Sequence, residues 1–215
     1  EDSDDICSIG VSVVEDLKDK DWARKIFQQA LDKAEDSGDI CSTGLLVLKE
    51  DGLGDKEWAR KIFQQALDKA EDCGDFTNLA DSICESLKDV EWAKEVYKKA
   101  ENQGMNESET EKREAIQKAS GKIAKKIPES MPLMGLAGGI SENLEDKAWA
   151  KEVYKKAEGK MREFGECYYL SASVNRRLGD KEHAKEILNQ ALKKIGGDDD
   201  KIEEIKEAIS DLDDE

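Results

Sequence analysis

The chain has 215 residues, and Asp and Glu outnumber Lys and Arg by 51 to 34, which gives a formal net charge of −17 at pH 7. A surface this acidic repels phosphate backbones and anionic lipid headgroups, which argues against nucleic acid and membrane surfaces as the main partners. Charged residues make up 40% of the chain and aromatic residues only 6%, a composition typical of long solvated helices rather than of β-sandwiches or barrels.

The N-terminal stretch, residues 1–10, begins without Met and shows no basic and apolar leader, so no signal peptide is visible. Either a leader was removed or the chain is a piece of something longer. Five cysteines occur without a CxxC pair, which disfavours zinc ligation and a disulfide framework and favours a reducing, cytoplasmic location. Cys7 and Cys41 occupy matching DICS segments, and we expect them to pack as small buried side chains.

Residues 19–36 and residues 55–72 are near-duplicates that differ only in Asp21 against Glu57. Aligning the chain on this segment gives five copies, whose marker residues are Trp22, Trp58, Trp92, Trp149 and His183. The spacings of 36, 34, 57 and 34 indicate a unit of 34 residues, with two extra residues before the second marker and 23 before the fourth. One unit cannot cover its own apolar stripe but stacked units can, so the repetition predicts an array.

Each unit shows the pattern of two helices. In the second helix of the first unit, apolar residues recur every three or four positions from Trp22 to Ala34, which predicts an amphipathic helix. The first helix of the third unit has the same period from Phe76 to Leu87, with Asp75 as the expected N-cap. Short joints such as LKD and LGD require the two helices of a unit to pack antiparallel.

The tryptophans are predicted to be structural. A large aromatic side chain next to an alanine on an amphipathic helix is expected to pack against a neighbouring pair and not to stack a ligand. We therefore expect Trp58 to be largely buried between the second and third pairs. His183 takes the place of Trp in the last unit, as expected for an end unit with one neighbour fewer.

The run LGDKEWARKIFQQAL, residues 53–67, resembles the joint and second helix of a tetratricopeptide repeat. The small, aromatic and small positions of that family recur in all five units. They are Ala23, Phe27 and Ala30; Ala59, Phe63 and Ala66; Ala93, Tyr97 and Ala100; Ala150, Tyr154 and Ala157; and Ala184, Leu188 and Ala191. The chain departs from the family pattern in lacking a proline after the second helix and in an offset of about one residue in the first helix. The resemblance implies an all-α fold, a right-handed α-solenoid of antiparallel helix pairs.

In chain order, the predicted array is repeat 1 (5–38), repeat 2 (39–74), repeat 3 (75–104), an inserted helix (105–131), repeat 4 (132–165), repeat 5 (166–196), and a C-terminal capping helix with an acidic tail (197–215). The inserted helix has two interpretations: a packing helix that fills a gap between two blocks of repeats, or a docking element for a partner. A helix from about Asp200 is expected to cover the last open face. At the other end Ile6, Ile9 and Val13 are expected to lie partly open.

The sequence offers no set of residues for catalysis. One His, no Ser–His–Asp or Cys–His set and no glycine-rich phosphate loop predict that the protein is not an enzyme. No cofactor and no metal site are expected.

Two function classes remain. The first is a protein–protein interaction module: if the family's geometry applies, the first helices line a concave face that binds a partner peptide or helix. The candidate partner-binding residues are Asn78, Ser82, Glu85, Asn143, Tyr169, Ser173, Arg176 and Arg177, in a wider row with Ser8, Ser12, Ser42 and Glu142. Tyr169 with the two arginines makes the fifth unit the expected site for an acidic peptide.

The second class is a structural or peripheral scaffold subunit of a larger or self-associating assembly, which docks through the array ends or the insert of residues 105–131. Neither class involves membrane insertion, because the longest uncharged stretch, residues 130–141, is too short to cross a bilayer.

Overall fold

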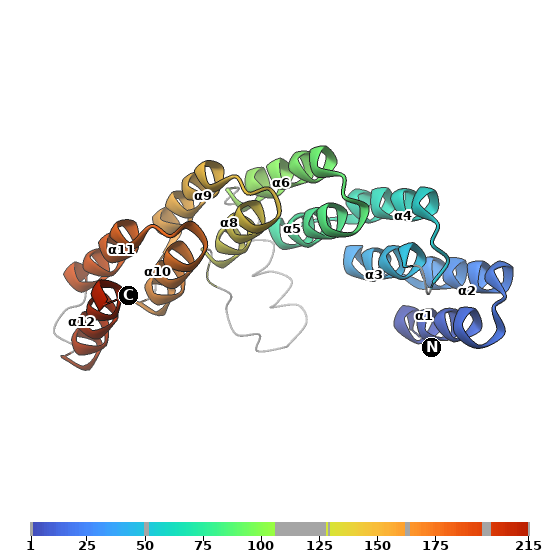
Figure 1. Ribbon diagram of the computed structural model, residues 1–215, viewed down its shortest axis with the longest axis horizontal. Coiled ribbons are helices and arrows are strands. Elements are labelled where there is room, and N and C mark those ends of the chain that lie inside the picture. Colours follow the sequence, from blue (N-terminus) through green and yellow to red (C-terminus); the bar gives the residue numbers. More distant parts are fainter. Residues whose placement is uncertain are drawn as a thin grey trace. The chain divides into compact units, whose positions relative to one another are not determined.

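The computed structural model describes residues 2–49, 52–105, 128, 130–161, 164–194 and 199–214. In these residues the chain is built of helices joined by turns, without a strand. The predicted all-α fold is confirmed: the helices pack in successive pairs as a solenoid of repeats (Figure 1). The chain divides into two compact units, Glu1–Ala100 and Glu101–Glu215.

Unit 1 contains three helix pairs. The first is α1 (Ser3–Ser12), which continues into a π-helical turn η1 (Val13–Leu17), and α2 (Lys20–Lys33). The second is α3 (Ser37–Leu48) and α4 (Lys56–Lys69). The third is α5 (Cys73–Ser82), which continues into a π-helical turn η2 (Ile83–Leu87), and α6 (Val90–Gly104), whose last residues belong to unit 2.

Unit 2 contains two further pairs and a final helix. The fourth pair is α8 (Met131–Asn143) and α9 (Lys147–Lys160), and the fifth is α10 (Phe164–Leu178) and α11 (Lys181–Lys194). The last helix, α12 (Asp199–Asp214), packs against α11, so the terminal helix predicted from about Asp200 is confirmed. The predicted inserted helix of residues 105–131 lies mostly outside the described residues.

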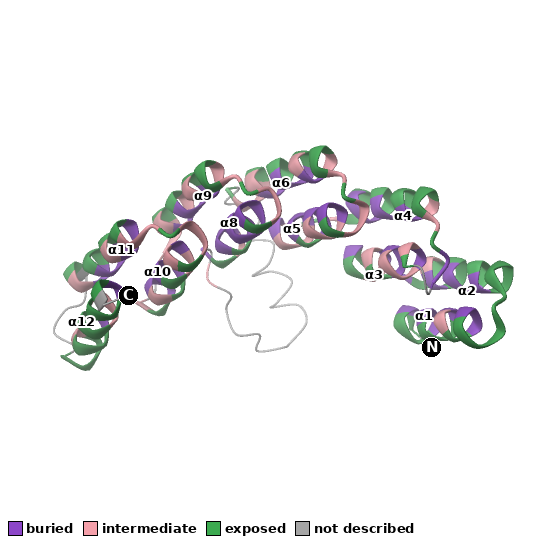
Figure 2. Cartoon of the chain, in the orientation of Figure 1, coloured by how far each residue is buried: buried purple, intermediate pink, exposed green. Residues whose placement is uncertain are grey.

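In the first two pairs a glycine of the first helix meets a phenylalanine of the second, and the equivalent residue of the other three pairs is also small. The small residues are Gly10, Gly44, Ala80, Ala137 and Ser171, all buried. A Cβ on Gly10 would come within 2.9 Å of the Phe27 ring, and one on Gly44 within 3.2 Å of the Phe63 ring. Buried residues lie where the two helices of a pair face each other (Figure 2). The side chains at the small, aromatic and small positions of the five second helices are all buried, and none of them is more than 4% exposed.

Each pair turns through one residue in the left-handed backbone region, with φ between 54° and 71°. These residues are Lys18, Gly54, Lys88, Glu145 and Gly179. A Cβ is strained in this region, so glycine suits the position better than the three charged residues do. The turn residue places the next residue, an aspartate in every pair, at the start of the second helix.

That aspartate is the N-cap of the second helix. In the first pair, Asp19 Oδ1 accepts a hydrogen bond of 2.9 Å from the backbone N–H of Trp22, and the same bond recurs in the other four pairs at 2.9–3.1 Å. An aspartate at this position satisfies one of the unpaired N–H groups of the first helical turn.

The N-cap predicted at Asp75 is wrong. Helix α5 begins one turn earlier, because the Asp72 carboxylate accepts a 2.9 Å hydrogen bond from the Asp75 backbone N–H. The Asp75 carboxylate accepts a bond from the Glu71 N–H at 2.9 Å in return. Both carboxylates therefore hold the start of the same helix, an exchange that resembles a capping box.

The first pair has an exposed side, but only one of the three residues predicted to lie there is exposed. Ile9 is 45% exposed as expected, whereas Ile6 and Val13 are buried. Both share the helix face of Gly10, which contacts Phe27 of α2, so they are covered by their own partner helix. Among the described residues, no helix combines the length and the apolar character that crossing a membrane requires.

We expect Gly179→Ala to lower the free energy of unfolding by about 1 kcal/mol, because the left-handed backbone at Gly179 strains any Cβ although the space around it is open. The matched control is Gly159→Ala, at an exposed site inside α9 with equally open surroundings, which should raise it by about 0.5–1 kcal/mol. Urea unfolding of both variants measures the difference. Equal effects of the two changes would contradict the role of the turn.

Candidate partner-binding surface

The candidate residues occupy equivalent positions on the first helices. The position two residues before the small residue of each pair is exposed in every pair, and it holds Ser8, Ser42, Asn78, Gly135 and Tyr169. The position five residues after the small residue is also exposed in every pair, and it holds Glu15, Lys49, Glu85, Glu142 and Arg176. We call these ten positions the first-helix face.

The fifth pair differs most from the others on this face. Tyr169 is 67% exposed and is the one aromatic residue of the first-helix face. Arg176 is exposed on the same side of α10, two turns further on, and Ser173 lies partly exposed between them. The structure thus brings an open aromatic ring and an arginine together on one helix.

Arg177 has a different role from its neighbour. Its Nε donates to Glu142 Oε1 at 2.7 Å, and its guanidinium covers Gly138, where a Cβ would come within 2.3 Å of Nη1. The Tyr154 hydroxyl nearby is buried without a hydrogen-bond partner among the described residues, and burial raises the pKa of Tyr154 while Arg177 opposes that rise. Arg177 therefore holds α10 against α8, and the charge of Arg176 is the more accessible one.

The candidates of unit 1 lie on α5 and η2. Asn78 and Glu85 are exposed, and Ser82 is partly exposed. The Ser82 hydroxyl donates to the Asn78 carbonyl oxygen at 2.9 Å and accepts from Cys41 Sγ at 3.5 Å, so it also connects α5 to α3. Asn143, the remaining candidate, is partly exposed at the end of α8 in unit 2.

Sequence reasoning missed an apolar hollow in unit 1. An open space of about 530 Å³ lies between α3 and η2, and it is lined by Ser42, Leu45, Leu46, Leu48, Lys49 and Ser86. The three leucines are only partly buried. The sequence did contain an indication of it. Residues Gly44–Leu48 are all apolar, whereas a helix that buries one face needs apolar residues on that face alone.

Trp58 and Trp92 lie beneath arginines of the preceding pair. Arg24 of α2 has its Cζ 4.5 Å from the centre of the Trp58 ring and is also ion-paired with Asp55. Trp58 is partly buried, and it faces the first pair rather than the third, which corrects the predicted location. The same arrangement recurs one pair later with Arg60 (Cζ at 4.4 Å), Asp89 and Trp92.

We call the N-cap aspartate and the tryptophan three residues later an arginine seat. Asp55 and Asp89 each use one carboxylate oxygen for the helix cap and the other for the arginine. Trp22, in the first pair, is 48% exposed and is the most exposed of the four tryptophans. The expectation of a buried tryptophan series is therefore wrong at this end of the array.

In unit 2 the same position makes polar contacts. The Trp149 indole Nε1–H donates to Glu101 Oε2 at 2.9 Å. His183, 7% exposed, lies with Nε2 2.5 Å from Glu158 Oε1. Glu101 and Glu158 stand where the first two pairs have Leu31 and Leu67, so a hydrogen-bond acceptor is present at this position in pairs three and four.

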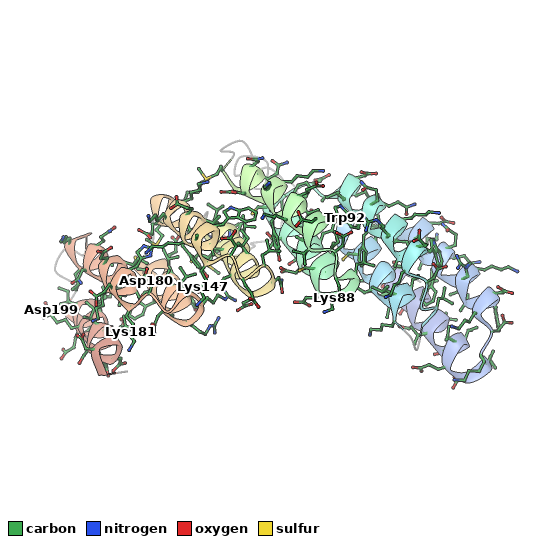
Figure 3. The ribbon with its side chains drawn as sticks, turned by 45° about the horizontal axis from the view of Figure 1, so that its top comes forward. Lys88, Trp92, Lys147, Asp180, Lys181 and Asp199 are labelled. Atoms are coloured by element: carbon green, nitrogen blue, oxygen red, sulfur yellow. The ribbon has the colours of Figure 1, made fainter. Side chains whose placement is uncertain are left out.

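Lysines replace the arginines in unit 2. Lys151 of α9 pairs with Asp180 at 2.5 Å, and Lys185 of α11 pairs with Asp213 of the last helix. Lys147, at the start of α9, lies near the turn that contains Asp180 (Figure 3), where its Nζ donates to the Leu178 carbonyl oxygen at 3.4 Å. A lysine keeps the charge of the seat but lacks the planar group that stacks on an indole.

These contacts perturb the titration of the caps. Hydrogen bonds from the Trp58 and Arg24 N–H groups lower the pKa of Asp55 below its ordinary value of 3.8. The pKa of Asp89 is lowered by Arg60 first and by the Trp92 N–H second, and that of Asp180 by Lys151 first and by the His183 N–H second. All three pKa values are thus lowered jointly by an N–H of the aspartate's own helix and by a cation of the preceding pair.

Cys7, Cys41 and Cys84 lie in surroundings that keep their thiols protonated. All five cysteines are free, and all but Cys41 are buried, so the predicted burial is confirmed for Cys7. Burial raises the pKa of the Cys7, Cys41 and Cys84 thiols, which opposes the formation of a nucleophilic thiolate. Within the described part of the chain, no group of three or more His, Cys, Asp or Glu residues lies together in a way that could hold a metal ion.

Comparison with known proteins points to one repeat family. Residues 165–193, which span most of the fifth pair, match the model of the tetratricopeptide repeat. Together with the five equivalent helix pairs, this match makes the chain a tetratricopeptide-like helical repeat protein. No curated protein matches the sequence. A solved structure described as a circular tandem repeat protein with novel repeat topology and enhanced subunit contact surfaces is 19% identical, with a TM-score of 0.20, and the alignment covers 96% of this chain and 43% of that one.

We expect Asp55→Ala to lower the free energy of unfolding by about 1–2 kcal/mol, because it removes the helix cap together with the ion pair. Asp55→Asn keeps a capping side chain and loses only the charge, so it should cost less than about 1 kcal/mol. Urea unfolding gives both values, and Arg24→Ala in the Asp55→Asn background completes a double-mutant cycle. A cost for Asp55→Asn as large as that of Asp55→Ala would show that the charge and not the cap is decisive.

The lowered pKa values also predict a pH dependence. An aspartate whose folded pKa lies below its unfolded value stabilises the fold above the unfolded value of about 3.9 and loses that contribution as pH falls through the folded one. We therefore expect the double variant Asp55→Asn, Asp89→Asn to lose less stability than the wild type between about pH 4 and pH 2. Chemical unfolding at several pH values tests this, and parallel curves would contradict it.

Proposed function

We propose that the chain is a non-catalytic protein-interaction module that binds a partner peptide or helix on its first-helix face, with the strongest contacts on the fifth pair. The observation that carries the proposal is the open ring of Tyr169, 67% exposed, beside the exposed Arg176. Both stand at positions that every pair exposes. The tetratricopeptide match of residues 165–193 includes both residues.

The chemistry of this surface favours an acidic partner. Tyr169 offers a rigid ring that buries a large area when it is covered. The guanidinium of Arg176 can bind a carboxylate through two parallel hydrogen bonds. The net charge of −17 opposes an acidic partner at long range, so the attraction must come from this local charge and is expected to weaken with salt.

A second function is a scaffold subunit that docks through the array ends or through residues 105–131. The observation that favours it is the open side of the first pair, where Ile9 is 45% exposed and Trp22 is 48% exposed. Light scattering separates the two functions, because a concentration-dependent ladder of masses is expected of a self-associating scaffold and a constant monomer mass of a peptide binder.

We expect the double variant Tyr169→Ala, Arg176→Glu to lose at least about ten-fold in partner capture, because it removes both the ring and the charge. Partners are captured from lysate on the immobilised chain and quantified by mass spectrometry. Helicity and melting temperature should stay nearly unchanged, because both side chains are exposed.

Lys155→Glu is the matched control. It reverses one exposed charge on α9 of the same unit and should leave capture intact. Capture that survives the double variant but disappears when residues 107–127 are replaced by a Gly/Ser bridge would reject the first-helix face in favour of the scaffold function.

A further inference from the structure

The hollow between α3 and η2 is apolar because the second pair carries leucines where other pairs carry small or polar residues. Leu46 stands two residues after the small residue of α3, and the equivalent residues of the other four pairs are Ser12, Ser82, Gly139 and Ser173. The next residue, Val47, is fully buried, so the helix already has its core contact without Leu46. The leucine therefore adds apolar surface beside the hollow rather than closing the pair.

The equivalent place in unit 2 is filled by a side chain of the chain itself. Arg177 stands there at the position that Ser86 has in the third pair. Its guanidinium covers Gly138, which is the equivalent of Leu45. Its Nε donates to Glu142 Oε1 at 2.7 Å. The fourth and fifth pairs thus fill this space with one long side chain and hold that side chain with an ion pair.

In unit 1 the same space is open and the sign of the neighbouring charge is reversed. Ser86 is much shorter than Arg177, and an open space of about 530 Å³ remains, within the range of about 300–1,000 Å³ that is usual for ligand pockets. Lys49 takes the place of Glu142 and is the one charged residue of the lining. No ion pair joins its ammonium group to a carboxylate of the described residues. By the pattern of unit 2, the side chain that fits here carries a carboxylate.

The length of the hollow suits a helix. Ser42 and Lys49 are seven residues apart on α3, which corresponds to about 10 Å along the helix axis. Leu45 and Leu46 lie between them on the same side of α3. Two side chains one turn apart on a partner helix are separated by about 5–6 Å, so both can contact this stretch while the next turn reaches Lys49.

We infer that the hollow is the docking site for an acidic amphipathic helix of a partner protein. Two apolar side chains of that helix, one turn apart, contact Leu45, Leu46 and Leu48, and an Asp or Glu in the adjoining turn pairs with Lys49. The inference rests on the proposed function, because Ser42 and Lys49 belong to the first-helix face, and it adds an apolar anchor to the acidic character proposed for the partner.

The probe is a library of random peptides of about 16 residues displayed on phage, a length that allows a helix to form. The peptides are selected on the immobilised full-length chain, and we expect the enriched ones to share two apolar residues three or four positions apart with an Asp or Glu one turn away. The double variant Lys49→Glu, Ser86→Arg gives unit 1 the residues that fill the space in unit 2. It should weaken the enriched peptides at least about ten-fold in fluorescence anisotropy.

Two single variants separate the apolar contact from the charged one. Leu46→Ser introduces the residue of three other pairs and should weaken the peptides about five-fold at every salt concentration. Lys49→Gln should weaken them about three-fold at low salt and reduce the salt dependence of binding. Helicity and melting temperature should stay close to those of the wild type, because neither residue is buried. Lys61→Glu, which reverses an exposed charge on α4, is the matched control and should leave the affinity unchanged.

Equal affinity of the enriched peptides for the wild type and for the Lys49→Glu, Ser86→Arg variant would overturn the inference. If Tyr169→Ala, Arg176→Glu weakened these peptides instead, the proposed function would stand and the hollow alone would be rejected, whereas peptides affected by neither variant would count against both.

Two other occupants have their own signatures, and either would also overturn the inference. Binding that appears only after residues 107–127 are replaced by a Gly/Ser bridge would identify a segment of this chain as the occupant. A molecular mass that rises with concentration and is restored to the monomer by Leu46→Ser would identify a second copy of the chain.

Discussion

The first two helix pairs each depend on one close contact between a glycine of the first helix and a phenylalanine ring of the second. Gly10 against Phe27 and Gly44 against Phe63 bring the two backbones so near that a methyl group would have to displace the ring. The contact fixes which side of each first helix is buried, and the remaining sides follow from the helical period. One side of the first helix must then pack against the next pair, and another side is left exposed to solvent. The stacking of pairs and the exposed first-helix face therefore both follow from this contact.

Contact between pairs is organised by the aspartate that starts each second helix. The residue has to be an oxygen acceptor for the local reason that a helix start leaves N–H groups unpaired. Its second oxygen is then free for a cation, and in three pairs that cation comes from the preceding pair. A local requirement of one helix thus supplies a contact between neighbours, which is how a short repeated sequence specifies both its own fold and its stacking.

Periodicity was enough to predict the helix pairs, the buried alanines and the final helix, because these follow from spacing along the chain. The N-cap of α5 was predicted at Asp75, but the hydrogen bonds place it at Asp72, one turn earlier. The position of Trp58 under Arg24 was not predictable either, since it depends on how pairs stack. The candidate residues Tyr169 and Arg176 were found from their places on a predicted first helix and from the resemblance to the repeat family, but the pairing of Arg177 with Glu142 required the distance between two helices. Whether the candidates bind a partner remains a prediction.

The two bonds that Asp55, Asp89 and Asp180 each make, one to a backbone N–H and one to a cation, respond differently to ionic strength. The bond to the backbone N–H joins groups three residues apart in one helix and is little affected by dissolved ions, whereas the bond to the arginine or lysine joins exposed charges that a salt solution screens over a distance of about 8–10 Å. Raising the salt concentration therefore loosens the joints between pairs while every helix keeps its start. Of the two bonds that such an aspartate makes, only the one that joins neighbouring pairs therefore responds to the ionic composition of the surroundings.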